Sequence, residues 1–559
     1  MARQAGVRIL GSAVVVTAAP TLTDVTGGEV VVAALALHDV GLVFGIPGTH
    51  NLSVFDALTR YGIRTVATTH EQGSGYAADG YARTSGRPGV AVVTSGPAVY
   101  NAATAVAQAY SDSIPMLLVS PGMPRDLPTG GPGSGYLHEA KDQTGVMERI
   151  AARCIRPTTH QEIADAVADA FTSFTGGRPR PVHLEVPLDL LDERGDASLV
   201  PAVVARPQPA PDTDVAQAAG LLAAADHPMI IAGGGARRAG DGLLAVAEAL
   251  GAPVATTING TGAIDHDHPL ALGARLGTPS VVSAADASDV LLVVGAELGN
   301  SDMWQGMLSP RGHVIRVDID PTMADVNITA DTMLVGDAAT VLRQLHVALV
   351  GAGCSPTAAP PWAVELRDAA ATDASVAGAR WRPWIDAIDV GRAPHSVVVT
   401  DNAMCVYFGT IGVLPMHDPA SFHFPTGFGT LGFTVPVAVG SALAAPDRQV
   451  IGITGDGGLL FTVTELAVAA AERLPMAIVV FDNSGYGEIR AEMLERDEKP
   501  LAVDAPPRDL VLLARALGAK AVRVETPDDL VAAIRLSTSH QGPTVIVVSE
   551  TPPPEGAAR

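Results

Sequence analysis

Residues 450–490 read VIGITGDGGLLFTVTELAVAAAERLPMAIVVFDNSGYGEIR, and this stretch decides the predicted fold. A short apolar run at 450–453 is followed, after a glycine-rich segment, by helix formers over 464–473. A second apolar run at 476–481 has the pattern of a strand buried on both faces. The stretch therefore predicts a strand, turn, helix, strand and loop, with the two strands parallel.

Two polar segments interrupt this stretch, GDGG at 455–458 and DNSGYG at 482–487. Both follow a predicted parallel strand, and open α/β sheets hold ligands at that edge. Asp456 offers a carboxylate oxygen and Asn483 an amide oxygen, which are ligands for Mg²⁺, while glycines let a diphosphate approach backbone N–H groups. Two ordinary β-turns are the alternative, but their connection by one helix and one buried strand favours a metal–diphosphate site.

The same stretch resembles the diphosphate-binding motif of thiamine diphosphate enzymes, in which GDG is followed, after a helix and a strand, by two asparagines. Here Asp482 stands in the place of the first asparagine, and Asn483 stands at the metal-ligand place. The resemblance implies that Asp456, Asn483 and the carbonyl of Gly485 hold Mg²⁺. It also implies cofactor contacts from Gly455, Asp456, Gly457, Gly458, Asn483, Ser484, Gly485 and Tyr486.

Composition narrows the class of protein. A chain of 559 residues requires several domains, and 47% hydrophobic residues exclude a disordered chain. The net charge of −23 is spread along the chain without a Lys/Arg-rich stretch, so no nucleic-acid partner is expected. No apolar run is long enough to span a bilayer, so no membrane partner is expected either.

Three widely spaced cysteines, Cys154, Cys354 and Cys405, are typical of a reducing compartment, and we expect a cytoplasmic protein in which all three are structural. Residues 1–27 contain two arginines and an apolar run that resembles a signal peptide. A disordered N-terminal tail is the favoured interpretation, because an intracellular enzyme body follows directly.

Residues 28–190 alternate between short apolar runs and helical segments, which predicts a doubly wound parallel-sheet domain. The expected strands are 42–46, 64–68, 90–94, 116–120 and 182–186. The turn that ends at Gly48 leaves room for a flat ligand.

Glu71 is the most informative residue of this domain, in the string THEQGSGYAADGYAR at 69–83. A carboxylate that opens a helix is favoured by the helix dipole alone, and that is the alternative interpretation. The whole string, however, resembles the pyrimidine-binding domain of thiamine diphosphate enzymes, whose essential glutamate occupies this place. The similarity continues through residues 94–97 and Asn101, with Ala98 where the family shows glycine.

A glycine-rich loop carries the string GYLHEAKDQ at 135–143. It resembles the 5-guanidino-2-oxopentanoate decarboxylase branch of the family more than acetolactate synthases. His138 within it is either a proton shuttle for the substrate or an ordinary surface histidine.

A Pro/Ala-rich linker at 200–214 separates a central domain at 215–350. The strand and glycine turn at 229–236 suit a dinucleotide phosphate but lack GxGxxG. In acetolactate synthases the corresponding domain carries FAD. The string ELGN at 297–300 does not resemble the synthase motif, so FAD is left open.

The third domain is expected at 381–559, after a second Ala/Pro/Thr-rich linker at 351–380. A strand at 397–400 runs into Asp401 and Asn402, which by resemblance meet the diphosphate. In the string TGFGTLGF at 426–433, the resemblance implies that Leu431 wedges beneath the cofactor and that the carbonyl of Gly429 binds its exocyclic amine. Ordinary core packing is the alternative for Leu431.

The resemblance thus implies three doubly wound parallel-sheet domains, pyrimidine-binding, central and diphosphate-binding. In these enzymes the two halves of each site come from different subunits, so a homodimer or homotetramer is implied. Glu71 would favour the imino tautomer of the cofactor, whose C2 ylid attacks a 2-oxo acid substrate; CO₂ then leaves and an enamine remains.

Capture of the enamine by a proton gives an aldehyde and a decarboxylase, whereas capture by a second carbonyl compound gives an acetolactate synthase-type carboligase. The synthases carry a Gln near the place of Gly122 and a Trp where residues 488–490 stand, and this chain has neither. Glu488 and Arg490 lie at the expected substrate mouth, unless they only begin a solvated helix. A third possibility is a catalytically silent, cofactor-binding subunit, which the presence of Glu71 disfavours.

Overall fold

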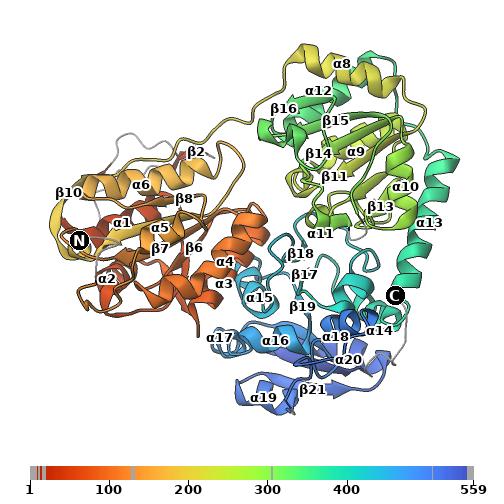
Figure 1. Cartoon of the computed structure of the whole chain (residues 1–559). Coiled ribbons are helices and arrows are strands. Elements are labelled where there is room, and N and C mark those ends of the chain that lie inside the picture. The colour runs from red at the N-terminus through yellow and green to blue at the C-terminus, as the bar shows by residue number, and fades with distance from the viewer. Residues whose placement is uncertain are drawn as a thin grey trace. The chain divides into compact units, whose positions relative to one another are not determined.

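The computed structural model describes residues 9–10, 13–14, 20–127, 133–303, 306–506 and 508–550. The chain folds as two compact units, residues 1–82 with 86–205 and residues 83–85 with 206–559. The first unit contains one six-stranded parallel sheet, and the second contains two (Figure 1). The predicted fold class, three parallel-sheet α/β domains, is confirmed.

The sheet of the N-terminal unit has the strand order β5-β4-β6-β7-β9-β8. Its strands are β4 (Leu42–Gly45), β5 (Arg64–Ala67), β6 (Gly89–Val92), β7 (Met116–Gly122), β8 (Arg153–Ile155) and β9 (Val182–Pro187). Its helices are α1 (Gly27–Leu37), α2 (Leu52–Tyr61), α3 (Glu71–Ser85), α4 (Pro97–Ser111), α5 (Gln143–Met147), α6 (His160–Ser173) and α7 (Leu188–Asp192). The five predicted strands are present; β6, β7 and β9 are buried along their whole length, whereas β5, at the edge of the sheet, buries only Val66.

An antiparallel pair, β3 (Thr21–Thr26) and β10 (Arg194–Ser198), joins the two ends of this unit. Thr26 then caps α1 in a capping box with Glu29. The disordered tail predicted at 1–27 is therefore wrong over residues 21–27, which form β3 and the start of α1 because β10 pairs with this segment. The rest of the tail lies outside the described residues, apart from the short pair β1 (Ile9–Leu10) and β2 (Ala13–Val14) and residue 20.

The central sheet has the order β13-β12-β11-β14-β15-β16. Its strands are β11 (Pro228–Ala232), β12 (Val254–Thr256), β13 (Ala271–Gly273), β14 (Val290–Val294), β15 (His313–Asp318) and β16 (Thr332–Val335). Its helices are α8 (Asp212–Ala223), α9 (Gly240–Leu250), α10 (Pro279–Ala287), α11 (Asn300–Met303) and α12 (Ala338–Gly351). Alternate residues of β14 enter different cores, Leu292 with α8, α9 and α12, and Leu291 with α10, so helices cover both faces.

The C-terminal sheet has the order β18-β17-β19-β20-β22-β21. Its strands are β17 (Val397–Thr400), β18 (Phe422–His423), β19 (Val450–Gly455), β20 (Met476–Asp482), β21 (Lys520–Val524) and β22 (Thr544–Ser549). Its helices are α14 (Arg382–Gly391), α15 (Thr434–Ala444), α16 (Asp456–Thr462), α17 (Glu465–Ala471), α18 (Gly487–Glu495), α19 (Leu510–Ala516) and α20 (Pro527–Ser537).

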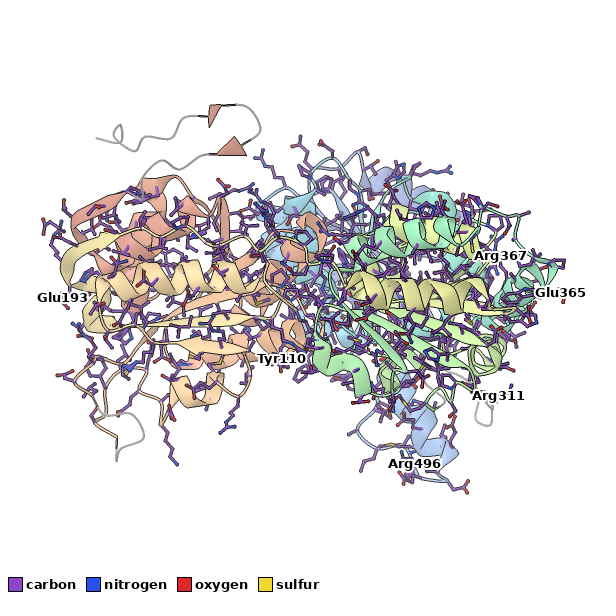
Figure 2. The ribbon with its side chains drawn as sticks, turned by 90° about the horizontal axis from the view of Figure 1, so that it is seen from above. Tyr110, Glu193, Arg311, Glu365, Arg367 and Arg496 are labelled. Carbon is purple, nitrogen blue, oxygen red and sulfur yellow. The ribbon has the colours of Figure 1, made fainter. Side chains whose placement is uncertain are left out.

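The structure corrects two further sequence-based predictions. The expected linker at 351–380 contains a 17-residue helix, α13 (Pro361–Ala377), because alanine is the best helix former and Pro361 stands at the first helical position. Its Arg367, labelled in Figure 2, donates to the carbonyl of His266 at 3.2 Å, so α13 is attached to the central domain. The helix expected at 464–473 is present as α17, whereas the turn expected at 455–458 runs into a further helix, α16, which begins at Asp456 itself.

Among the described residues, no helix combines the length and the apolar character needed to cross a lipid bilayer.

Candidate functional site

Three predicted site loops of the C-terminal domain follow three neighbouring strands. Asp401 follows β17, Asp456 follows β19 and Asn483 follows β20, and these strands are consecutive in the sheet. All three are parallel, so their carboxyl ends lie at one edge. The fold thus brings residues 82 positions apart in sequence to a single surface.

The two polar segments of this edge contact each other directly. The backbone N–H of Asn483 donates to Oδ1 of Asp456 at 3.4 Å. A Cβ placed on Gly457 would lie 3.0 Å from the ring of Tyr486 and 3.7 Å from the carbonyl oxygen of Gly485. The glycine therefore allows the second loop to approach the first, and it puts the Gly485 carbonyl beside the Asp456 segment.

Charged side chains gather at this edge, where Asp482 also pairs with Arg523 at 3.4 Å. Asp456 is only 1% exposed, and burial raises its pKa, which the neighbouring Arg508 opposes. Arg508 forms an ion pair with Asp456 and lies 4.0 Å from Asp482. A buried carboxylate requires a cation, and sequence reasoning missed Arg508, which lies 52 residues downstream of Asp456 and in no motif.

The donors at this edge fit a hard cation. Oδ1 of Asn483 accepts from the N–H of Gly485 at 3.1 Å, an Asx turn that turns Ser484 into a left-handed conformation with φ of +63°. A carboxylate, an amide oxygen and a nearby backbone carbonyl are the few oxygen ligands that Mg²⁺ accepts beside phosphate oxygens. A Mg²⁺ ion at this place would bind Asp456 together with Arg508, or would displace the Arg508 guanidinium from Asp456.

Asp401 and Asn402 hold the loop at 426–433 in place. The Asp401 carboxylate accepts from the N–H of Gly432 at 3.1 Å, and Nδ2 of Asn402 donates to the carbonyl of Thr430 at 2.8 Å. Burial raises the pKa of Asp401 to about 6. Gly458 packs against Asp401, since a Cβ there would lie 3.1 Å from its Cγ. The side chains of Asp401 and Asn402 therefore position backbone around the site.

Within this loop, Gly429 has φ of +68°, a backbone conformation that favours glycine. No atom lies within 4 Å of the position that its Cβ would take, so a close neighbour is not the reason for glycine here. Leu431 is half-buried and Phe428 is 52% exposed. The loop thus presents apolar side chains at a surface, which ordinary core packing of Leu431 does not explain.

The predicted substrate residues Glu488 and Arg490 lie in the first turns of α18. Arg490 forms an ion pair with Asp504. Gly487 lies against Asn483, since a Cβ there would be 2.6 Å from Nδ2 of Asn483. The start of α18 is therefore attached to the loop that carries the predicted metal ligands.

In the N-terminal unit, Glu71 is the first residue of α3 and is half-buried. Nδ2 of Asn101, on α4, donates to Oε2 of Glu71 at 2.9 Å. Gly48 lies at the end of the neighbouring strand β4, where a Cβ would lie 2.9 Å from the side chain of Thr94. Glu71, Gly48 and Asn101, predicted separately, thus belong to the ends of three adjacent strands, β5, β4 and β6.

The string GYLHEAKDQ folds into a loop built by its own polar side chains. Glu139 accepts from the N–H groups of Ser134 and Gly135 at 2.8–2.9 Å, and these backbone hydrogen bonds lower its pKa. Oε1 of buried Gln143 accepts from the N–H of Gly96 at 2.7 Å, which ties the loop to the start of α4. Within this string, His138 lies beside Ser95, which follows strand β6.

His138 meets Ser95, which belongs to the matched segment 94–97, and His50, which sequence reasoning passed over. Oγ of Ser95 lies 2.7 Å from Nδ1 of His50 and 3.3 Å from Nδ1 of His138. The two imidazole rings have centroids 5.0 Å apart. His50 stands two residues after Gly48, and that adjacency was the available signal for it.

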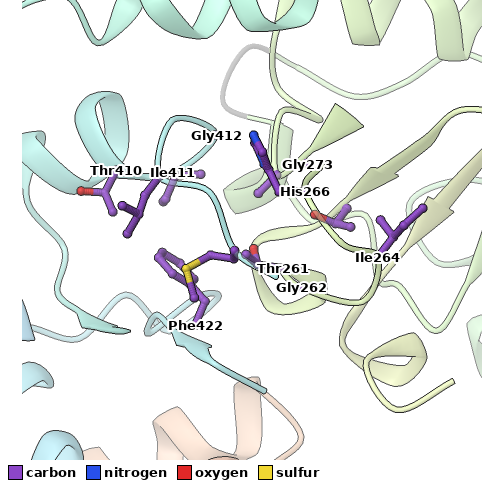
Figure 3. A pocket seen from close by; sticks show the side chains of 13 residues that line it. Thr261, Gly262, Ile264, His266, Gly273, Thr410, Ile411, Gly412 and Phe422 are labelled. Atoms are coloured by element: carbon purple, nitrogen blue, oxygen red, sulfur yellow. The ribbon is translucent and has the colours of Figure 1, made fainter. Parts of the chain in front are cut away.

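The glycines of the central domain are explained by packing. A Cβ on Gly233 would lie 2.2 Å from the carbonyl oxygen of Gly295, and one on Gly235 would lie 2.9 Å from Cα of Gly295. A small pocket lies beside His266 and Gly412 (Figure 3), with a volume of about 20 Å³. A larger neighbour of about 160 Å³ is lined by Arg275, and both are smaller than a typical ligand pocket of about 300 Å³ or more.

Comparisons with known proteins agree with this architecture. Three doubly wound domains with polar residues at their strand ends are typical of a cofactor-dependent α/β enzyme. Residues 25–146, 215–345 and 405–548 match, respectively, the N-terminal TPP binding domain, the central domain and the C-terminal TPP binding domain of thiamine pyrophosphate enzymes. The chain belongs to the thiamine pyrophosphate enzyme family, which confirms the resemblance found in its sequence.

Several relatives match over nearly the whole chain. A Pseudomonas aeruginosa protein named "Probable 2-ketoarginine decarboxylase" is 37% identical over 93% of each chain. A Methanocaldococcus jannaschii protein named "Probable acetolactate synthase large subunit" is 33% identical over 90% of this chain and 88% of its own. The acetolactate synthase isozyme 2 large subunit of Escherichia coli is 32% identical over 94% and 95%.

Proposed function

We propose that this protein is a thiamine diphosphate- and Mg²⁺-dependent decarboxylase that converts a 2-oxo acid to an aldehyde and CO₂. The substrate we favour carries a guanidinium group, because the relative at 37% identity is named a 2-ketoarginine decarboxylase, and the loop at 135–143 resembles that branch. An acetolactate synthase-type carboligase is the second candidate, supported by relatives at 32–33% identity.

The observation that carries the choice is the environment of Gly122. This glycine falls near the place where acetolactate synthases carry a glutamine. A Cβ there would lie 2.4 Å from Oε1 of Glu185, which is 2% exposed and accepts from Oγ1 of Thr144 at 3.0 Å. A glutamine at this place would require Glu185 to move, so the site is built without the synthase side chain.

The chain's own residues supply binding and proton transfer. Asp456, Asn483 and the Gly485 carbonyl hold Mg²⁺, and the glycines at 455–458 let the diphosphate reach backbone N–H groups. Thiamine diphosphate, when bound, supplies the electron sink for loss of CO₂. Glu71, held by Asn101, would hydrogen-bond the cofactor and favour its reactive tautomer, and Leu431 would pack against it.

The assembly follows from the same proposal. Domain boundaries at 28–190, 215–350 and 381–559 place Glu71 and the diphosphate site on different domains. We infer a homodimer or homotetramer in which two subunits complete each site, in the cytoplasm. FAD in the central domain is a secondary hypothesis, which the visible absorption spectrum of the purified protein tests directly.

A product assay tests the function. The protein is incubated with thiamine diphosphate, Mg²⁺ and single 2-oxo acids, including pyruvate, 5-guanidino-2-oxopentanoate and aliphatic acids of similar length. Mass spectrometry should find an aldehyde from an acid larger than pyruvate and little acetolactate from pyruvate. Faster formation of acetolactate than of any aldehyde supports the carboligase instead, and cofactor binding without CO₂ release from any acid supports a silent subunit.

A further inference from the structure

A histidine pair bridged by a serine lies at the same sheet edge as Glu71. His50 follows β4, Ser95 follows β6, and Glu71 follows β5, and these three strands are neighbours in the sheet. His138 reaches Ser95 from the loop at 135–143. Four polar side chains from four separate segments thus gather where open α/β sheets hold their ligands.

The three side chains form a continuous hydrogen-bonded chain. Ser95 is fully buried and His50 is 6% exposed, whereas His138 is half-buried and adjoins solvent. The serine hydroxyl lies 2.7 Å from Nδ1 of one ring and 3.3 Å from Nδ1 of the other. Because a hydroxyl both donates and accepts, it connects an inner ring with an outer ring.

The loop holds its histidine at a conformational cost. His138 has φ of +62°, a left-handed conformation that is uncommon for residues other than glycine. Gly96 makes the approach possible, since a Cβ on Gly96 would lie 2.5 Å from the carbonyl oxygen of His138. Gln143 then fixes the loop to the N–H of Gly96. Surface packing of a histidine needs none of these arrangements.

The environment of His50 favours a neutral ring. Burial lowers the pKa of His50, and the nearby His138 lowers it further. The ring of Tyr136, 6.2 Å away between centroids, faces His50 as well. In its neutral form the His50 imidazole has one ring nitrogen that donates and one that accepts, as a relay requires.

From this geometry we infer that His138, Ser95 and His50 form a proton relay that protonates the substrate carbon after CO₂ has left. This inference rests on the proposed decarboxylase. A solvent proton enters at Nε2 of His138, Nδ1–H of His138 passes a proton to Oγ of Ser95, and the hydroxyl proton of Ser95 passes to Nδ1 of His50. Nε2–H of His50 then protonates the carbon, so that one proton and one 2-oxo acid give one CO₂ and one aldehyde.

Single-turnover kinetics separate this step from loss of CO₂. Enzyme in excess over a carboxyl-labelled 2-oxo acid, identified by the product assay, is mixed with thiamine diphosphate and Mg²⁺, and CO₂ and aldehyde are followed separately. His50→Gln and His138→Asn should release first-turnover CO₂ within about 3-fold of the parent, while aldehyde forms about 10²-fold more slowly. Asparagine suits the positive φ at 138, so this variant keeps the loop conformation.

The double variant gives the sharpest result. Residues in series share one path, so His50→Gln/His138→Asn should be no slower than the slower single variant, within about 3-fold. His346→Gln, on α12 of the central domain, is the control and should match the parent. Unchanged calorimetric affinity for thiamine diphosphate verifies folding, and His138→Asn at the surface tests the relay even if His50→Gln does not fold.

Three results would overturn the relay: aldehyde formation at the parental rate, equal losses of CO₂ and aldehyde, or multiplied effects in the double variant. A failure of the proposed function has a different signature. In that case the parent protein releases no CO₂ from any acid in the panel, or it converts pyruvate to acetolactate. Both proposals are then refuted by the parent alone, before any variant is compared.

Discussion

The carboxyl edges of the N-terminal and C-terminal sheets have the same scaffold and different chemistry. At the N-terminal edge the carboxylate of Glu71 accepts from the neutral amide of Asn101, and the hydroxyl of Ser95 lies between His50 and His138. The C-terminal edge places Asp456 and Asp482 around the guanidinium of Arg508. Parallel strands fix where side chains gather, but the side chains decide whether that edge moves protons or holds ions.

The difference follows from how each carboxylate is satisfied. Glu71 is half-buried and accepts a hydrogen bond from a neutral amide N–H. Asp456 is nearly fully buried and already requires a cation. An anionic diphosphate therefore has a place at the C-terminal edge only with a further cation, since the chain carries a net charge of −23.

The largest effect on cofactor binding is expected at the carboxyl edge of the C-terminal sheet. Asp456→Ala removes the anionic Mg²⁺ ligand and leaves Arg508 without its buried partner, so thiamine diphosphate binding should become undetectable in calorimetric titration. Chelation of Mg²⁺ should do the same to the parent. Asp482→Asn is the matched control, because it removes a neighbouring charge that we do not assign to the metal, and its affinity should stay within about 10-fold. Undiminished binding to Asp456→Ala would refute the site.

A change of Glu71, at the carboxyl edge of the N-terminal sheet, should preserve cofactor binding but slow turnover. Glu71→Gln keeps the shape of the side chain but cannot stabilise a protonated cofactor ring, so hydrogen–deuterium exchange at C2 of the bound cofactor should slow by about 10²- to 10⁴-fold. The measurement is acid quench followed by NMR. Glu162→Gln, another acid in the first turn of a helix in this unit, is the control and should cost about 1 kcal/mol or less of stability with exchange unchanged. Equal exchange rates in Glu71→Gln and the parent would reduce Glu71 to a helix-dipole role.

The sequence predicted what depends on local pattern. Continuous apolar runs identified the strands of both edges, and the polar segments after them, at Glu71, Asp456 and Asn483, lie where parallel strands must end. The roles of these residues as ligands and catalyst are still predictions, since their placement and not their chemistry is what the fold determines.

The sequence did not predict what depends on contacts between distant segments. His50 and Arg508 are in no motif, and each gains its meaning from a partner 45 or 52 residues away, Ser95 or Asp456. The helix α13 was missed for a different reason, because Ala/Pro/Thr composition suits both a linker and a proline-started helix, and packing of Ala370 in the central core decides between them.

The last prediction uses pH to separate the two sheets, through one buried group in each. His183 on β9 is fully buried and burial lowers its pKa to about 3, whereas burial raises the pKa of Asp401 to about 6. Below about pH 6.5, the pKa of histidine in the unfolded state, His183 binds a proton in the unfolded protein but stays neutral in the folded protein. The contribution of His183 to the free energy of unfolding is therefore lost as the pH falls from about 6.5 toward about 3. For Asp401 the folded state holds the extra proton between about 3.8 and 6, so its stabilisation is present at low pH and lost as pH rises to 6.

Lowering the pH from 6.5 to 4.5 should therefore make the contribution of His183 less favourable and that of Asp401 more favourable, by about 2 kcal/mol each at 1.36 kcal/mol per pKa unit. Hydrogen–deuterium exchange of peptides from β9 and β17 in the cofactor-free protein measures the two sheets separately. His183→Gln should change the pH dependence of β9 alone, and Asp401→Asn that of β17 alone, because each removes one group whose protonation differs between the folded and unfolded states. The prediction is refuted if His183→Gln leaves the pH dependence of exchange in β9 unchanged and Asp401→Asn leaves that in β17 unchanged. In that case the buried His183 and Asp401 do not control the pH response of their sheets.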